Sequence, residues 1–83
     1  MTEPLYTAHK NSFDDVYSVG YFCMVLTIHE EDDNRKNDYE WGFKNDDGSI
    51  SVCGNIPGAG SYTPLSEAIE KFHTFLQKPI DNP

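Results

Sequence analysis

Basic residues are scarce in this chain. Lys and Arg number 6 among 83 residues, against 14 Asp and Glu, and the formal net charge is −8. Nucleic-acid binding depends on Lys and Arg that neutralise phosphates, so nucleic acid and anionic membranes are poor direct partners for this protein. Long hydrophobic runs are also missing. The longest, Tyr21 to Leu26, is far shorter than the ~20 residues of a membrane-spanning helix.

Cysteine is nearly absent as well. Cys23 and Cys53 are too few for a disulfide framework, and both fall within stretches that are typical of strands. The opening residues Met1–Pro4 lack the basic and apolar regions of a secretory signal. We therefore expect a cytoplasmic protein whose two thiols are reduced, buried and protonated.

Motifs for metals, cofactors and catalysis are missing too. The histidines are isolated, no CxxC or HxxxH spacing occurs, and the acidic segment from Asp32 to Asp38 lacks the residue order of a calcium loop. The glycine-rich segment Gly54–Ser61 lacks the lysine of a phosphate-binding loop. A chain this small also has little room for a deep catalytic cleft beside its core. We predict a protein without cofactor or metal that is not an enzyme; a thermal shift on adding calcium or zinc would revive the alternative of a small metal protein.

The hydrophobic pattern predicts three strands followed by a helix. Tyr17–His29 is rich in β-branched and aromatic residues, Tyr39–Lys44 alternates in polarity, and Ser49–Asn55 follows a turn at Asn45–Gly48. After Thr63 and Pro64, apolar residues recur at helical spacing: Leu65, Ala68, Ile69, Phe72, Phe75 and Leu76. We expect an α+β fold in which one C-terminal helix packs across a three-stranded antiparallel sheet, in the order β-β-β-α.

The remaining segments lack a strong pattern. We expect one domain over residues 1–83, with a loose arm at 1–12, a charged loop at His29–Asp38 and a loose tail at 79–83. Ser12 and Asp15 have the spacing of a capping box, which is consistent with a short helical turn around Phe13–Tyr17. After the turn at Asn45–Gly48, we expect Ile50, Val52 and Ile56 to point to the same face of the sheet.

Both faces of the predicted first strand are apolar, yet one helix covers only one face. Phe22, Met24, Leu26 and Ile28 alternate with Val19, Tyr21, Cys23, Val25 and Thr27. Either the N-terminal arm with Leu5, Tyr6 and Phe13 folds over the second face, or that face meets a partner.

An acidic block with interleaved aromatic residues remains the main functional candidate. Between Glu30 and Asp47 there are eight carboxylates and three basic residues, Arg35, Lys36 and Lys44. Such a block is often only a solubilising surface. Alternatively, it attracts a basic partner by its electric field and holds it with aromatic anchors. The residues that we assign to this surface are Glu30, Glu31, Asp32, Asp33, Tyr39, Glu40, Trp41, Asp46 and Asp47.

These features predict an inhibitor or antidote that docks on a basic, nucleic-acid-handling protein and imitates nucleic acid with its carboxylates. In size, acidity and lack of cofactor motifs the chain resembles small phage anti-defence inhibitors and bacterial immunity proteins. The alternative is a structural homodimer or assembly component that pairs through the first strand.

Overall fold

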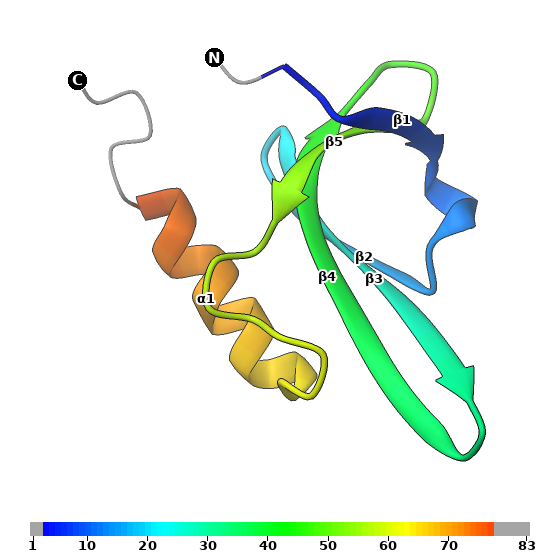
Figure 1. Cartoon of the computed structure of the whole chain (residues 1–83). Coiled ribbons are helices and arrows are strands. Elements are labelled where there is room, and N and C mark those ends of the chain that lie inside the picture. Colours follow the sequence, from blue (N-terminus) through cyan, green and yellow to red (C-terminus); the bar gives the residue numbers. More distant parts are fainter. Residues whose placement is uncertain (1–2, 78–83) are drawn as a thin grey trace.

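The computed structural model describes residues 3–77 and contains a five-stranded antiparallel sheet and one helix (Figure 1). The elements in chain order are β1 (Tyr6–His9), the 3-10 turn η1 (Lys10–Ser12), β2 (Asp15–Val19), β3 (Phe22–Glu31), β4 (Asn34–Lys44), β5 (Ser49–Asn55) and α1 (Leu65–Gln77). The strand order is β1-β5-β4-β3-β2. The α+β class and the C-terminal helix are confirmed, whereas the prediction of a three-stranded sheet is wrong.

Two features of the N-terminal third account for the additional strands. The predicted strand Tyr17–His29 is divided by a turn at Gly20, whose φ of 64° suits glycine, and β2 and β3 pair on either side of it. The segment that we expected as a loose arm instead supplies β1, which pairs with β5, and η1. The helical turn expected at Phe13–Tyr17 is therefore absent, because Asp15–Val19 is a strand. The tail at 79–83 lies outside the described residues.

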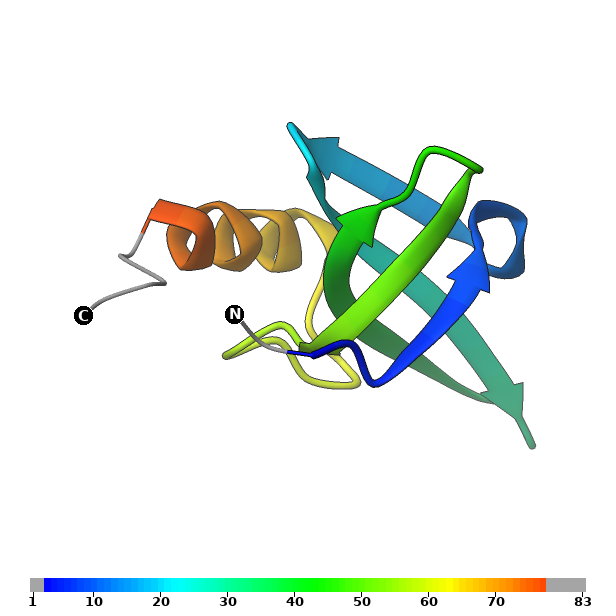
Figure 2. The ribbon, with the colours of Figure 1, turned by 90° about the horizontal axis from the view of Figure 1, so that it is seen from above.

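The sheet curls, and this curl buries both faces of β3. Seen from above, α1 lies on the outer face, while β1, η1 and β2 close around the inner face (Figure 2). The outer cluster consists of Met24, Leu26, Tyr39, Ile56, Ala68 and Phe72. The inner cluster consists of Cys23, Val25, Ile50 and Val52, with Phe13 and Val16 packed against it. The second apolar face is thus covered by the chain itself, and Phe13 contributes to that cover.

A β-bulge between β4 and β5 helps the sheet to curl. Trp41 faces Gly54 but Gly42 faces Val52, so Cys53 is an extra residue on β5. The bulge reverses the alternation along β5. Ile50 and Val52 therefore point to the inner cluster whereas Ile56 reaches the outer one, contrary to the prediction that all three share a face.

The rest of the chain follows its local sequence signals closely. The turn after β4 is closed by Asp47, whose carboxylate accepts hydrogen bonds from the backbone N–H and the hydroxyl of Ser49. The predicted apolar stripe of α1 faces the outer cluster, where Ala68 and Phe72 are buried. No helix within residues 3–77 has the length and apolar character needed to cross a membrane.

We predict that Gly42→Ala strongly destabilises the protein. A Cβ atom at this position would lie 2.2 Å from the backbone oxygen of Ser51, and neither group can move without displacing a strand. We expect a loss of about 3 kcal/mol or more in the free energy of unfolding, measured by urea denaturation. Gly54→Ala is the matched control, because its Cβ would meet only the Trp41 Nε1 atom at 3.7 Å. Equal stability of the two variants would contradict the close approach at Gly42.

Candidate functional site

The acidic segment after β3 is a tight hairpin. We expected a charged loop over His29–Asp38, but β3 continues to Glu31 and β4 begins at Asn34, so only Asp32 and Asp33 form the turn. Their φ angles are 49° and 66°, in the left-handed region that a two-residue type I′ hairpin turn requires. Aspartate enters this region more readily than most residues other than glycine, which explains how a turn without glycine forms here.

The outer end of this hairpin extends beyond the rest of the sheet (Figure 1). The Asp14 carboxylate accepts the backbone N–H of Ile28 at 2.7 Å, just past the last pair between β2 and β3. On the other side, the backbone N–H of Asn37 donates to the carbonyl of Ser61 at 2.8 Å. Beyond these two contacts, residues 29–36 form a two-stranded ribbon.

Four consecutive carboxylates occupy the end of the ribbon. We call this group the acidic tip: Glu30, Glu31, Asp32 and Asp33. All four side chains are exposed, and the ribbon offers only Arg35 and Lys36 as basic neighbours. The tip is therefore a compact source of negative potential at one end of the molecule.

The other predicted site residues do not join the acidic tip in one surface. Asp46 and Asp47 lie at the opposite end of β4, and the eleven residues of that strand extend over about 35 Å. Glu40 lies near the middle of β4 and is half-buried.

The two predicted aromatic anchors face the helix and contribute to the core. Tyr39 is 2% exposed, and its hydroxyl donates to the Thr63 carbonyl at 2.7 Å. Trp41 is half-buried, with its ring centroid 4.9 Å from that of Phe75. Tyr39 thus fixes the loop before α1 to β4 rather than offering a surface for a partner.

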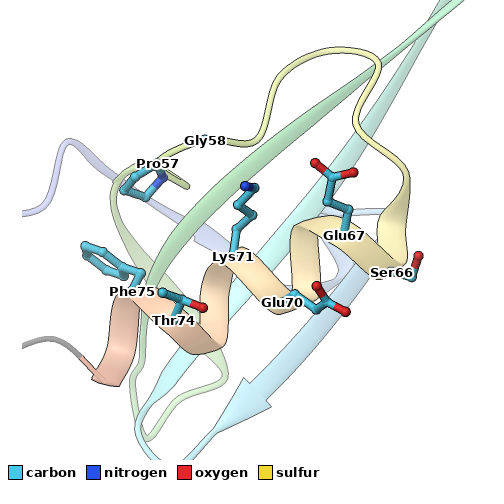
Figure 3. A pocket seen from close by; sticks show the side chains of 8 residues that line it. All are labelled: Pro57, Gly58, Ser66, Glu67, Glu70, Lys71, Thr74 and Phe75. Atoms are coloured by element: carbon cyan, nitrogen blue, oxygen red, sulfur yellow. The ribbon is translucent and has the colours of Figure 1, made fainter.

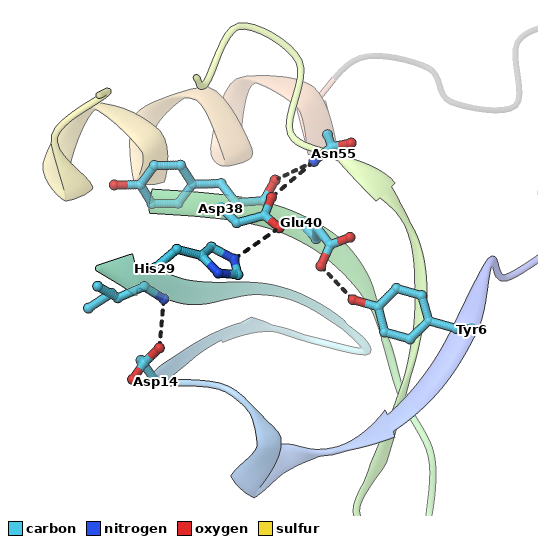
Figure 4. Close-up of polar contacts among 8 residues, drawn as sticks. Tyr6, Asp14, His29, Asp38, Glu40 and Asn55 are labelled. Atoms are coloured by element: carbon cyan, nitrogen blue, oxygen red, sulfur yellow. Dashed lines mark hydrogen bonds and ion pairs between the residues drawn. The ribbon is translucent and has the colours of Figure 1, made fainter. Parts of the chain in front are cut away.

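A polar cluster lies on the inner side of β4 at the base of the ribbon (Figure 4). The Tyr6 hydroxyl donates to Glu40 at 2.5 Å, the Asn55 amide donates to Asp38 at 3.3 Å, and His29 Nε2 lies 3.9 Å from an Asp38 oxygen. Burial, then the hydrogen bond to Glu40 and its charge, raise the pKa of the Tyr6 phenol. These contacts join β1, β3, β4 and β5, so the cluster anchors the ribbon to the body of the protein.

Two exposed tyrosines near the ribbon were missed in the sequence. Tyr6 is 42% exposed beside Glu40, and Tyr62 is 70% exposed in the loop segment that lies against Asn37. Neither belongs to the acidic block in sequence, and pairing across the sheet and loop brings them near it. The sequence offered little indication of this. Both are large aromatic residues in segments whose apolar residues show no regular spacing.

A shallow hollow of about 760 Å³ lies between α1 and the preceding loop (Figure 3). Its charged residues are Glu67, Glu70 and Lys71, and the Lys71 side chain extends over Gly58. Charges of both signs and an open shape give this hollow no distinct preference for a ligand.

The site shows no arrangement for metal or thiol chemistry within residues 3–77. No group of three or more His, Cys, Asp or Glu side chains converges there to hold a metal ion. Burial raises the pKa of both thiols, that of Cys23 to about 11, so they are protonated at neutral pH.

Comparison with protein-family models, with curated proteins and with solved structures found no match.

We predict that Tyr6→Phe changes the alkaline limb of the stability profile. A raised phenol pKa stabilises the fold below its unfolded value of about 10, and this contribution is lost as pH rises through the higher folded value. At neutral pH the variant should lose about 0.5–1 kcal/mol of unfolding free energy, since the pair is partly screened by solvent. Above pH of about 10 its stability should fall less steeply than that of the wild type. Urea denaturation across pH measures both effects.

Tyr62→Phe serves as the control, because the Tyr62 side chain is 70% exposed and lies outside the Tyr6–Glu40 pair. Identical alkaline limbs for Tyr6→Phe and the wild type would show that the Tyr6–Glu40 bond does not form in solution.

Proposed function

We propose that this chain is a non-enzymatic binding protein that docks on a basic, nucleic-acid-handling protein through the acidic tip. The observation that carries the proposal is the placement of four consecutive carboxylates at the projecting end of the sheet, two on the last residues of β3 and two on the turn that follows. Like charges in such close succession repel one another, so the fold keeps this concentration of charge in spite of the repulsion.

Charge and shape support the same mode of binding. The molecule measures 43 × 27 × 18 Å along its principal axes, and the ribbon projects from its body. A narrow anionic projection fits a groove lined by Lys and Arg, where its carboxylates occupy positions of phosphates. Occupation of that groove would exclude nucleic acid, which is the action of an inhibitor or antidote.

The exposed tyrosines supply the contact surface that the buried aromatics do not. Tyr6 and Tyr62 lie near the base of the ribbon on two different elements, and tyrosine contributes large contact area with little loss of side-chain entropy. The tip would steer the partner during encounter, and the tyrosines would hold it after contact.

The test compares two triple variants of equal charge. Glu31→Gln, Asp32→Asn and Asp33→Gly together remove three of the four carboxylates of the acidic tip while providing the Asn-Gly pair that a type I′ turn prefers. The control carries Asp46→Asn, Glu67→Gln and Glu70→Gln, which lie on the β4–β5 turn and on α1. Proteins from source-cell lysate are captured on the immobilised wild type, with and without duplex DNA as a competitor. Proteins that salt releases are then identified and purified.

We expect the tip variant to associate with the purified partner about tenfold more slowly, with a flatter salt dependence, while the control stays close to wild type. Stopped-flow measurements over a range of salt concentrations give both quantities, and thermal unfolding confirms that each variant is folded. Equal slowing in both variants, or capture that duplex DNA does not affect, would contradict the proposal.

Self-association through a sheet edge is the second candidate. The strand that we expected to pair, now β3, has β2 on one side and β4 on the other, so a dimer would use the edge strands β1 or β2. Val19 and Tyr21, which are 39% and 80% exposed at the end of β2, favour that edge. A dimer in sedimentation, with a melting temperature that falls on dilution, would support this candidate.

A further inference from the structure

The inner face of the curled sheet opens at the end opposite the acidic tip. A hollow of about 260 Å³ lies there, between η1, β2 and the turn after β4. We call it the lysine hollow, and its lining residues are Lys10, Val16, Ser18, Lys44, Asn45, Gly48 and Ile50. Ligand sites are concave and combine an apolar lining with a few polar groups.

The charge of the lysine hollow is opposite to that of the rest of the molecule. It gathers Lys10 and Lys44, two of only six Lys and Arg residues in the chain, and no carboxylate belongs to its lining. Within residues 3–77, neither ammonium group forms an ion pair with a carboxylate. The nearby Asp47 carboxylate is turned into its own loop, where it accepts two hydrogen bonds from Ser49.

Lys44 lies on the inner face of the sheet. Gly42 pairs with Cys23 of the inner cluster, and Lys44 is two residues further along β4, on the same face. Its charge also reaches the Cys23 thiol, where it opposes the larger effect of burial on the pKa. Lys44 therefore starts from the inner face of the sheet, and its side chain is exposed to solvent.

Apolar and hydroxyl groups complete the lining. Ile50 belongs to the inner cluster and Val16 packs against it, and these two residues form an apolar floor. Ser18 contributes a hydroxyl group. The Asn45 amide instead donates to the hydroxyls of Ser49 and Ser51, which holds that side chain in place. The volume is below the roughly 300–1,000 Å³ of sites for drug-sized ligands, so it suits a small molecule.

We propose that the lysine hollow binds a small oxyanion, held by the ammonium groups of Lys10 and Lys44 above the Val16–Ile50 floor. A carboxylate or a phosphate group would satisfy both lysines, and a short hydrocarbon part of the ligand would cover the floor. This site is separate from the acidic tip and does not depend on the proposed partner.

Titration followed by amide NMR spectra tests the proposal. Inorganic phosphate and butyrate are added separately to the full chain at constant ionic strength and pH. We expect saturable shifts confined to the amides of residues 10, 16–18, 44–50 and their immediate neighbours. Tighter binding of phosphate would identify a phosphate ligand, and tighter binding of butyrate a carboxylate with an apolar part; either supports the site.

The matched variants are Lys10→Gln with Lys44→Gln, and Lys36→Gln with Lys71→Gln, which lower the positive charge equally. The first pair should weaken binding by about tenfold or more, and the second should leave it unchanged. Non-saturating shifts spread over all lysines, or equal weakening in both pairs, would overturn the proposal. Should the first pair fail to fold, the location and saturation of the wild-type shifts decide the question.

Discussion

The approach of β4 to β5 at Gly42 is the constraint on which the arrangement of the sheet depends. A side chain there would collide with the backbone of Ser51, and the adjacent bulge at Cys53 bends β5 and reverses its alternation. The resulting curl lets one sheet enclose an apolar cluster on its inner side while α1 covers the other. Residues 3–77 thereby bury both faces of a central strand with one sheet and one helix.

The curl also determines where the charged side chains lie. It directs the long β3–β4 hairpin away from the body, so the acidic tip projects, while the opposite end of the inner face holds the lysine hollow. Lys10 and Lys44 lie at the end away from the acidic tip, near Asp46 and Asp47 of the turn after β4, so the excess of negative charge is greater at the tip than at this end.

The sequence was most informative for elements whose secondary structure depends on local residues alone. The helix stripe around Phe72, the Asp47–Gly48 turn and the limits of β5 follow from local periodicity and turn chemistry, and all three agree with the structure. The strand pair around the acidic tip was misread as a loop, because a turn of two aspartates carries none of the usual glycine signal.

Pairing between distant segments could not be read from local patterns. Tyr6–His9 has no periodicity of its own, and its strand form comes from hydrogen bonds to β5. Tyr39 was read as an exposed anchor because its neighbours are charged, yet alternate residues of β4 face opposite sides of the sheet, and α1 covers the side of Tyr39. The predicted acidic surface grouped residues that are close in sequence. In the structure, the length of β4 separates the acidic tip from Asp46 and Asp47.

The hydrogen bond from Ile28 to Asp14 has a consequence for motion. Where β2 stops, the backbone N–H of Ile28 bonds to the Asp14 side chain instead of to a backbone carbonyl of a neighbouring strand. Beyond this bond, the ribbon has no neighbouring strand within the described chain. Short two-stranded segments open and close without unfolding of the remaining structure. The four carboxylates thus sit on a part of the molecule that can fray locally while the curled sheet behind them stays intact.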